Sequence, residues 1–313
     1  MADQFQTGDV FLFEPDDSCI SRLICKLSDS PVSHAAMYFE DGKIVEEGLP
    51  HIGTRPIDKL GDRAVHVRRY ARHEESAAAL RKVAGKRLAD KEPYSMGNLV
   101  MVGVLIVFKA WKPDARWAVK QVLTALCILI AKAIDHYKTG GKHGATCSQL
   151  VYEMYDEAGF HLNVIQKNMV SAANAPSLLE ETQALLAEGK LDEVDESAAS
   201  ELDKAAAMGG KNFDLEKLCC ALLAVMDGND RANVMESAEE SEQDEVYEEV
   251  VRFASMVLQA DLVDTVFTRD TGILDWGKRA LAHLMNNYAG FITPGQLYSD
   301  CPDLAHEIIV LKP

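Results

Sequence analysis

Cys147 is the residue in this 313-residue chain whose position most clearly suits chemistry. It follows the glycine-rich segment 140–144 and lies at the start of the run 146–159, whose apolar residues recur at helical spacing. The unpaired N–H groups at a helix N-terminus favour a thiolate, which is the nucleophilic form of cysteine. The position therefore predicts a cysteine nucleophile. The same position also suits a cysteine that only packs as a small apolar residue.

A cysteine nucleophile needs a base within hydrogen-bond reach, and the sequence has nine histidines. His34 stands apart because it begins a predicted strand, 34–39, and is followed by small and apolar residues. Strands hold catalytic groups rigidly. His73, His136 and His143 lie in charged stretches instead. His34 is therefore the candidate base, although a structural role for it stays open.

Five short stretches occur in a recognisable order. They are Thr-Gly-Asp-Val at 7–10, Ser-His-Ala-Ala-Met-Tyr-Phe at 33–39, Glu-Pro-Tyr-Ser at 92–95, Thr-Cys-Ser-Gln-Leu-Val at 146–151 and Ile-Thr-Pro-Gly-Gln-Leu at 292–297. Together they resemble the circularly permuted papain-like families of the NlpC/P60 type, which include permuted papain-like amidases and the lecithin:retinol acyltransferase group. In those permuted families the histidine precedes the cysteine, as it does here.

The resemblance implies a triad of Cys147 as nucleophile, His34 as base and Glu46 as the group that orients His34, with no cofactor and no metal. Strand geometry leaves Glu47 open as an alternate, because side chains alternate between the faces of a sheet. A two-residue loop at Asp41-Gly42 would favour Glu47, whereas a three-residue loop would favour Glu46. Tyr94 is a further alternate site residue, lining the pocket or simply half-buried at a helix start.

The elements that must position these residues follow from hydrophobic periodicity and turn signals. Strands are predicted at 9–14, 34–39, 43–47, 64–70 and 308–311, and helices at 18–27, 74–90, 95–111, 115–137, 146–159 and throughout 162–288. This order predicts an α+β fold with an insertion. The resemblance implies a circularly permuted papain-like (NlpC/P60) fold, with a small antiparallel sheet and helices, over 1–160 and 290–313. Residues 161–289 are then a large acidic helical insertion.

The net charge of −17 is concentrated in one segment of the chain. Residues 176–250 hold 21 acidic and 5 basic side chains, and the remaining residues hold 28 and 27. The chain lacks the basic face of a general nucleic-acid binder, so no nucleic-acid partner is expected. The acidic insertion could bind a basic protein partner, or it could be a solvated helical cap on the core.

The longest apolar runs, 99–108 and 122–131, are ten residues each. A membrane span needs about 20 apolar residues, so the region 96–134 predicts buried helices, or contact with a membrane surface, rather than a transmembrane span. The N-terminus has no basic region followed by an apolar stretch, which predicts no signal peptide. We therefore expect a protein that is cytoplasmic as synthesised, with signal-independent secretion left open.

Three functions are compatible with these residues. The first is a cysteine hydrolase that cleaves an amide, such as a peptide, isopeptide or peptidoglycan bond, through a thioester acyl-enzyme. The second is a lipid acyl hydrolase or acyltransferase of the retinol-acyltransferase type, suggested by the two apolar runs. The third is a non-catalytic binding module that uses the acidic helical insertion. The expected ligand is a small peptide or a lipid acyl substrate.

Overall fold

The computed structural model describes ten segments of the chain, namely residues 4–47, 51–90, 97–137, 146–165, 175–191, 214–228, 245–262, 276–288, 291–304 and 306–311. The chain divides into two compact units. The first unit consists of Met1–Asn98, Lys142–Lys167 and Phe291–Pro313, and the second consists of Leu99–Gly141 and Asn168–Gly290. The two apolar helices that the sequence analysis assigned to the 1–160 domain thus belong to the second unit, which is formed from two segments rather than from 161–289 alone.

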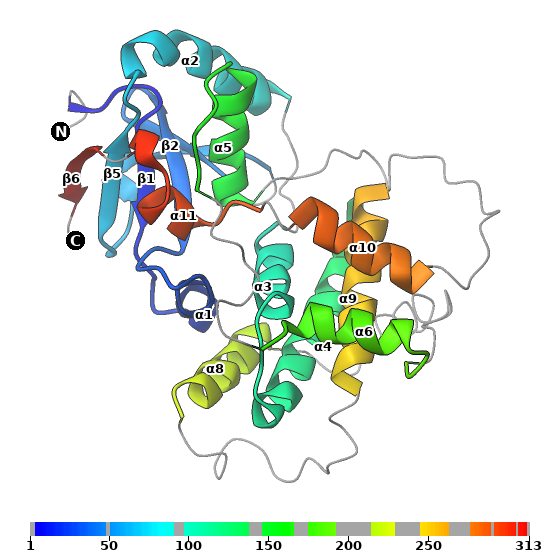
Figure 1. Ribbon diagram of the computed structural model, residues 1–313. Coiled ribbons are helices and arrows are strands. Elements are labelled where there is room, and N and C mark those ends of the chain that lie inside the picture. Colours follow the sequence, from blue (N-terminus) through cyan, green and yellow to red (C-terminus); the bar gives the residue numbers. More distant parts are fainter. Residues whose placement is uncertain are drawn as a thin grey trace. The chain divides into compact units, whose positions relative to one another are not determined.

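The first unit contains a six-stranded sheet with the order β4-β3-β2-β1-β5-β6 (Figure 1). Every neighbouring pair of strands is antiparallel. The strands are β1 (Val10–Phe13), β2 (His34–Glu40), β3 (Lys43–Glu46), β4 (Gly53–Pro56), β5 (Val65–Arg69) and β6 (His306–Leu311).

Four α-helices and two 3-10 helices belong to the described part of the first unit. They are α1 (Cys19–Ser28), α2 (His73–Ala89), α5 (Cys147–Glu157) and α11 (Pro294–Ser299), with the 3-10 helices η2 (Ile57–Lys59) and η6 (Pro302–Leu304). Figure 1 shows α2 and α5 side by side against the strands. Buried side chains from α2 and α5 pack on one set of alternating strand residues, which comprises Val10, Leu12, Ala35, Met37 and Val45.

The opposite face of the sheet has its own apolar cluster. Its members are Phe5, Phe11, Phe13, Ala36, Tyr38, Ile44, Leu60, Val65 and Val67. The strand residues of the two clusters alternate along β1, β2 and β3, as a pleated sheet with both faces covered requires. Face assignment is therefore fixed for every residue of these strands, including those at the strand ends.

The described part of the second unit is helical. Its helices are α3 (Gly97–Val107), which begins at the unit boundary, α4 (Pro113–Tyr137), α6 (Leu178–Ala187), α8 (Leu215–Met226), α9 (Glu245–Leu262) and α10 (Trp276–Tyr288). α4 packs against α8 and α9, and α9 against α10 and α6. A Cβ on Gly103 of α3 would lie 2.2 Å from Phe253 of α9, so only glycine permits this approach.

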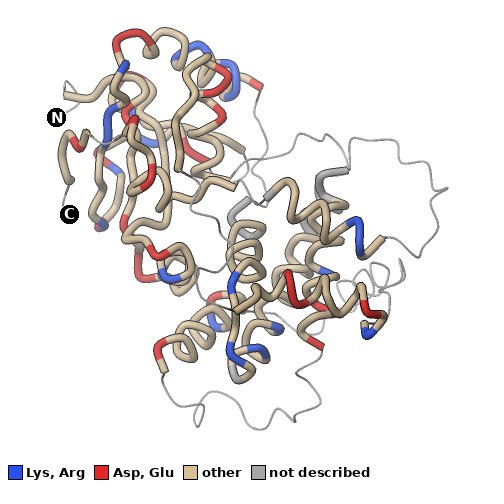
Figure 2. The backbone as a smooth tube through the Cα atoms, viewed as in Figure 1, with Lys and Arg blue, Asp and Glu red and all other residues tan. Residues whose placement is uncertain are grey.

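The apolar runs at 99–108 and 122–131 are covered by other residues. Their buried members include Met101, Val104, Val122 and Leu126. Among the helices that the structure describes, none has the length and hydropathy to cross a bilayer. Much of the acidic stretch 236–249 lies outside the described residues. In the first unit, Figure 2 shows acidic and basic residues interspersed, in keeping with the balanced charge outside 176–250.

The structure confirms the α+β class and the small antiparallel sheet. All five predicted strands are present, and the predicted helices at 18–27, 74–90 and 146–159 are α1, α2 and α5. One strand was not predicted. β4 contains Gly53 and Pro56, which are poor strand formers, and it pairs only with β3 at the sheet edge, where such residues are tolerated.

Candidate active site

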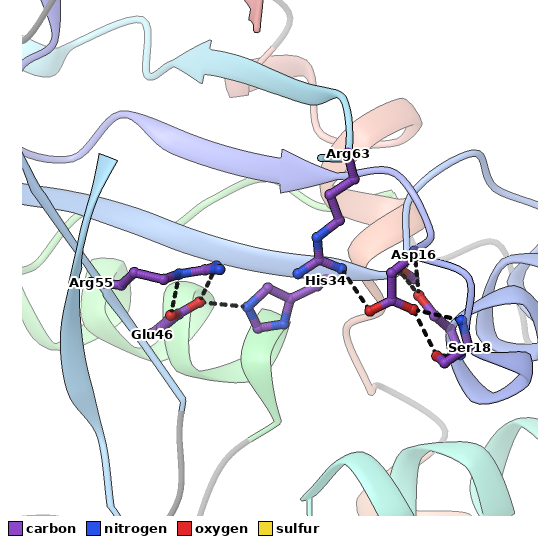
Figure 3. Close-up of polar contacts among 8 residues, drawn as sticks. Asp16, Ser18, His34, Glu46, Arg55 and Arg63 are labelled. Carbon is purple, nitrogen blue, oxygen red and sulfur yellow. Dashed lines mark hydrogen bonds and ion pairs between the residues drawn. The ribbon is translucent and has the colours of Figure 1, made fainter. Parts of the chain in front are cut away.

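His34 is the first residue of β2, where it pairs with Phe13 at the end of β1. Its Nε2 lies 3.0 Å from Glu46 Oε2 at the end of β3 (Figure 3). Both side chains are 15% exposed, so their interaction is partly shielded from water. The Nε2 contact leaves Nδ1 as the ring nitrogen available to Cys147.

A bulge in the β2–β3 ladder places Glu46 on this face. Tyr38 pairs with Ile44, whereas Glu40 pairs with Lys43, so Phe39 is an extra residue on β2. The loop is the two-residue Asp41-Gly42 turn, but the extra residue shifts the register by one. Glu46 therefore shares a face with His34, as it would after a three-residue loop.

The Thr-Gly-Asp-Val stretch near the N-terminus holds this bulge. The buried Thr7 hydroxyl donates a hydrogen bond of 2.6 Å to the carbonyl oxygen of Phe39, the extra residue. The N–H of Gly8 donates to the Tyr38 carbonyl at 3.0 Å. The bulged backbone thus keeps hydrogen-bond partners, as buried backbone groups require.

Arg55 on β4 fixes the other side of the Glu46 carboxylate. Its Nη2 donates to Oε2 at 2.8 Å, and its Nε lies 2.7 Å from Oε1. This two-point contact is the strong geometry of an arginine–carboxylate pair. The pKa of Glu46 is lowered: burial alone would raise it, but the bonds and charges of His34 and Arg55 outweigh burial. Glu46 is therefore an ionised acceptor for His34 at neutral pH.

Cys147 is the first residue of α5 and is only 1% exposed. Thr146 caps the helix, with its side chain accepting a hydrogen bond from Gln149 N at 3.2 Å. Ser148 donates a hydrogen bond of 2.7 Å to the carbonyl oxygen of Ile292, just before α11. The position of the Cys147 backbone is thus fixed from both the helix cap and the C-terminal segment.

Several residue types in the Ile-Thr-Pro-Gly-Gln-Leu stretch, 292–297, have a structural reason. Thr293 and Gln296 form a capping box at the start of α11, with Pro294 in its first turn. A Cβ on Gly295 would lie 2.5 Å from Ser30 Cβ, so glycine is required for close packing. The stretch therefore packs α11 beside the chain that leads into β2 and supports the start of α5.

His34 lies between the Glu46 carboxylate and the sulfur of Cys147, and both affect its pKa. Burial by itself would lower its pKa, but the charge and hydrogen bond of Cys147, followed by those of Glu46, raise the pKa of His34 to about 9. The imidazole is then protonated at neutral pH, opposite the sulfur of Cys147. A thiolate–imidazolium pair is the reactive form of a cysteine nucleophile with its histidine partner.

Phe13 and two further side chains surround His34. The rings of Phe13 and His34 lie 5.3 Å apart between centroids. The guanidinium carbon of Arg63 is 4.7 Å from the Phe13 ring centroid, and that of Arg55 is 5.2 Å away. Figure 3 shows Arg63 reaching past His34 toward Asp16. The site thus holds two guanidinium groups within a protein whose net charge is −17.

Cys25 in α1 provides a contrast to Cys147 within the same unit. It is a free, half-buried thiol. Burial raises the pKa of Cys25 to about 11, with the charges of Glu14 and Asp16 adding to this and a hydrogen bond from Ser33 opposing it. Among the described residues, no histidine acts on the Cys25 thiol as His34 acts on Cys147, so Cys25 serves as an internal reference thiol.

The structure brings together three of the five residues singled out from the sequence, namely Cys147, His34 and Glu46. Glu47 is buried, and the carboxylate bonded to His34 is that of Glu46. Tyr94 lies outside the described residues.

Sequence reasoning did not find Arg55, Phe13 or Arg63. Arg55 shares the face of Ile44, its partner across the β3–β4 pair, so recognising β4 would have placed it beside Glu46. Phe13 could have been found from the alternation of β1, because it follows Phe11 on the same face. No sequence signal marks Arg63, which stands in a loop.

In comparisons with known proteins, no family model and no curated relative matches the chain.

Proposed function

We propose that this protein is a cysteine hydrolase that cleaves an amide bond through Cys147, His34 and Glu46. The observation that carries the proposal is the position of His34, which contacts the Glu46 carboxylate through Nε2 and interacts with the Cys147 sulfur. A nucleophile, a base and a group that orients the base, each within reach of the next, define this class of site. We further propose that the α+β unit is a permuted papain-like fold, because the histidine strand precedes the cysteine helix.

The reaction begins with the thiolate–imidazolium pair. Cys147 Sγ attacks the amide carbonyl carbon, and the negative charge moves to the carbonyl oxygen. The backbone N–H of Cys147, at the N-terminus of α5, can donate a hydrogen bond to this oxyanion. As the carbonyl re-forms, the C–N bond breaks and the amine leaves with the proton of His34. The acyl group remains on Cys147 as a thioester.

Water completes the cycle. His34, now neutral, takes a proton from a water molecule, whose oxygen attacks the thioester carbon. Collapse of that intermediate releases the carboxylic acid and restores the thiolate and the imidazolium. Glu46 keeps the imidazole in the required orientation and stabilises its positive charge in both half-reactions. Arg55 in turn holds Glu46 in place.

Amide cleavage is favoured over lipid acyl chemistry because of how the apolar helices are packed. The side chains of α3 and α4 that suggested lipid binding, such as Val104 and Leu126, are buried. An acyl chain or a bilayer surface would need exposed apolar area. Among the described residues, Ile165 is the single large hydrophobic residue whose side chain is exposed.

The test uses intact-protein mass spectrometry after brief incubation with three substrate sets: short peptide amides, peptidoglycan stem peptides and phospholipid vesicles. We expect an acyl adduct on Cys147 from an amide set, removable by hydroxylamine as a thioester is. Cys147→Ala should abolish the adduct and lower turnover by on the order of 10⁴-fold or more. Cys25→Ala should leave both unchanged. An adduct formed only from vesicles would overturn the amide assignment.

A further inference from the structure

Arg63 lies close to the reacting groups although it belongs to a loop, at 60–64, between η2 and β5. Its guanidinium stacks over Phe13, the ring that also packs against His34. Its charge interacts with those of Cys147 and Glu46 as well as with Asp16. Arg63 therefore places a positive charge beside the nucleophile without belonging to the Cys147, His34 and Glu46 set.

The hydrogen-bonding capacity of Arg63 is not used within the described chain. A guanidinium has five N–H donors. In the segments that the structure describes, Arg63 makes one ion pair, at 3.6 Å with Asp16, and no hydrogen bond. Asp16 is 53% exposed and already accepts hydrogen bonds from Ser18, so it is a weak, solvent-screened partner.

Arg55, unlike Arg63, has a close carboxylate partner. Both arginines lie against Phe13, but Arg55 contacts both oxygens of Glu46. The Arg63 side chain is 17% exposed, so it is held in place yet open to solvent. Burial lowers the pKa of Arg63 and the charge of Arg55 adds to this, whereas Asp16, Glu46 and Cys147 oppose it. A second anion at this position would supply the missing partner.

We infer that Arg63 is a substrate-binding residue that receives a carboxylate of the substrate beside the bond that Cys147 attacks. The inference rests on the proposed hydrolase and adds the class of substrate: an acyl compound with a carboxylate near its scissile amide. A carboxylate fits better than a phosphate for two reasons. Among the described residues that lie against Phe13, Arg63 is the one cation that is not bound to both oxygens of a carboxylate, and Asp16 adds a negative charge nearby. The planar fork of Arg63 can bind both carboxylate oxygens at once.

Two alkylating reagents test this without any knowledge of the substrate. Iodoacetate and iodoacetamide have the same leaving group and nearly the same size, but only iodoacetate carries a carboxylate. In each reaction the Cys147 thiolate displaces iodide and forms a carbon–sulfur bond. Rates are measured residue by residue by peptide mass spectrometry on the full chain, and the readout is the ratio of the iodoacetate rate to the iodoacetamide rate at Cys147.

We expect Arg63→Met to lower this ratio by about tenfold, as the loss of a charge-assisted hydrogen bond implies. Arg63→Lys should retain an intermediate ratio, because it keeps the charge without the fork. Asp16→Asn should raise the ratio, since it removes the competing carboxylate and keeps an acceptor for Ser18. Arg72→Met is the matched control, because Arg72 also stacks on aromatic rings, those of Tyr70 and Phe160, and should leave the ratio unchanged.

Different results overturn different claims. An unchanged ratio in Arg63→Met refutes the carboxylate site. If both reagents are also slowed in equal proportion, Arg63 acts on the thiolate instead. Stronger protection of Cys147 by inorganic phosphate than by acetate overturns the carboxylate in favour of a phosphate. By contrast, iodoacetamide labelling of Cys147 no faster than of Cys25 in the unaltered protein refutes the proposed nucleophile itself.

Discussion

Glu46 reaches His34 Nε2, at 3.0 Å, because β2 contains one residue more than β3 between their last cross-strand pairs. Without the extra residue, Phe39, the turn at Asp41-Gly42 would place Glu47 on the face of His34. A single backbone irregularity thus selects which of two adjacent glutamates faces the histidine. Bulges often direct a side chain in this way next to active sites.

Glu46→Gln should change the pH dependence of hydrolysis. The Glu46 carboxylate is one of the groups that raise the pKa of His34 to about 9, so its neutralisation lowers that pKa. The alkaline limb of the kcat/KM profile should move to lower pH, and the maximum should fall by about 10²-fold or more. Glu47→Gln is the matched control and should retain the original profile. Equal profiles for the two variants would contradict the assignment of Glu46.

Arg55→Met should affect the acid side of the same profile. Arg55 is among the groups that lower the pKa of Glu46, so its loss raises that pKa and moves the acid limb of activity to higher pH. Because the pair is half-buried, we also expect a loss of about 1–2 kcal/mol in the free energy of unfolding. Arg55→Lys should recover charge but not the two-point contact. An acid limb unaffected by either variant would show that Arg55 does not act through Glu46.

The contribution of His34 to the free energy of unfolding should decrease as the pH rises. Its pKa is raised to about 9 in the folded protein from an ordinary value of 6.5, so its contribution is fully present below pH 6.5 and is lost as the pH rises through 9. The stability deficit of His34→Gln should therefore shrink between these values.

Amide hydrogen exchange in β1 and β2 is the suitable measurement, because the three tryptophans, at 111, 117 and 276, all belong to the second unit and would not report on the sheet. A deficit that grows as the pH rises would contradict the thiolate–imidazolium pair.

Thr7→Val should weaken the β2–β3 bulge at Phe39 without changing any residue of the Cys147, His34 and Glu46 set. It removes the hydroxyl that bonds the Phe39 carbonyl and leaves a buried acceptor without that partner, at a cost of about 1–3 kcal/mol. Because the bulge sets the position of Glu46, turnover should fall as well. Thr7→Ser should restore both stability and turnover. A loss of stability with full turnover would show that the register does not depend on this bond.

Gly8→Ala should destabilise the first unit more than Gly159→Ala. Both glycines have positive φ, of 100° and 81°, and alanine is strained at either position. At Gly8 the new Cβ would also lie 2.7 Å from Leu80 Cδ1, whereas nothing lies within 4 Å at Gly159. We expect a loss of about 1 kcal/mol at Gly159 and about 2–4 kcal/mol at Gly8, measured by hydrogen exchange. Equal losses would indicate that the packing around Gly8 is loose.

The local elements of the first unit could be predicted from the sequence because each has a strong local signal. β2 and β3 alternate around an Asp-Gly turn, and α5 has an apolar stripe that ends near Gly159. β4 could not be predicted, since its pairing with β3 rather than its own residues makes it a strand. The assignment of 99–141 to the second unit also escaped prediction, because an apolar helix does not specify which helices will cover it.

The sequence by itself determined that a cysteine begins a helix and a histidine begins a strand, since both follow from short-range periodicity and capping. Only the tertiary structure decided that Glu46 rather than Glu47 faces His34, because the choice depends on one bulged residue in a ladder between two strands. It also decided that Arg55 and Arg63 surround the site. Their positions come from strand pairing and loop packing between residues far apart in the chain, and such contacts leave no periodic trace in the sequence.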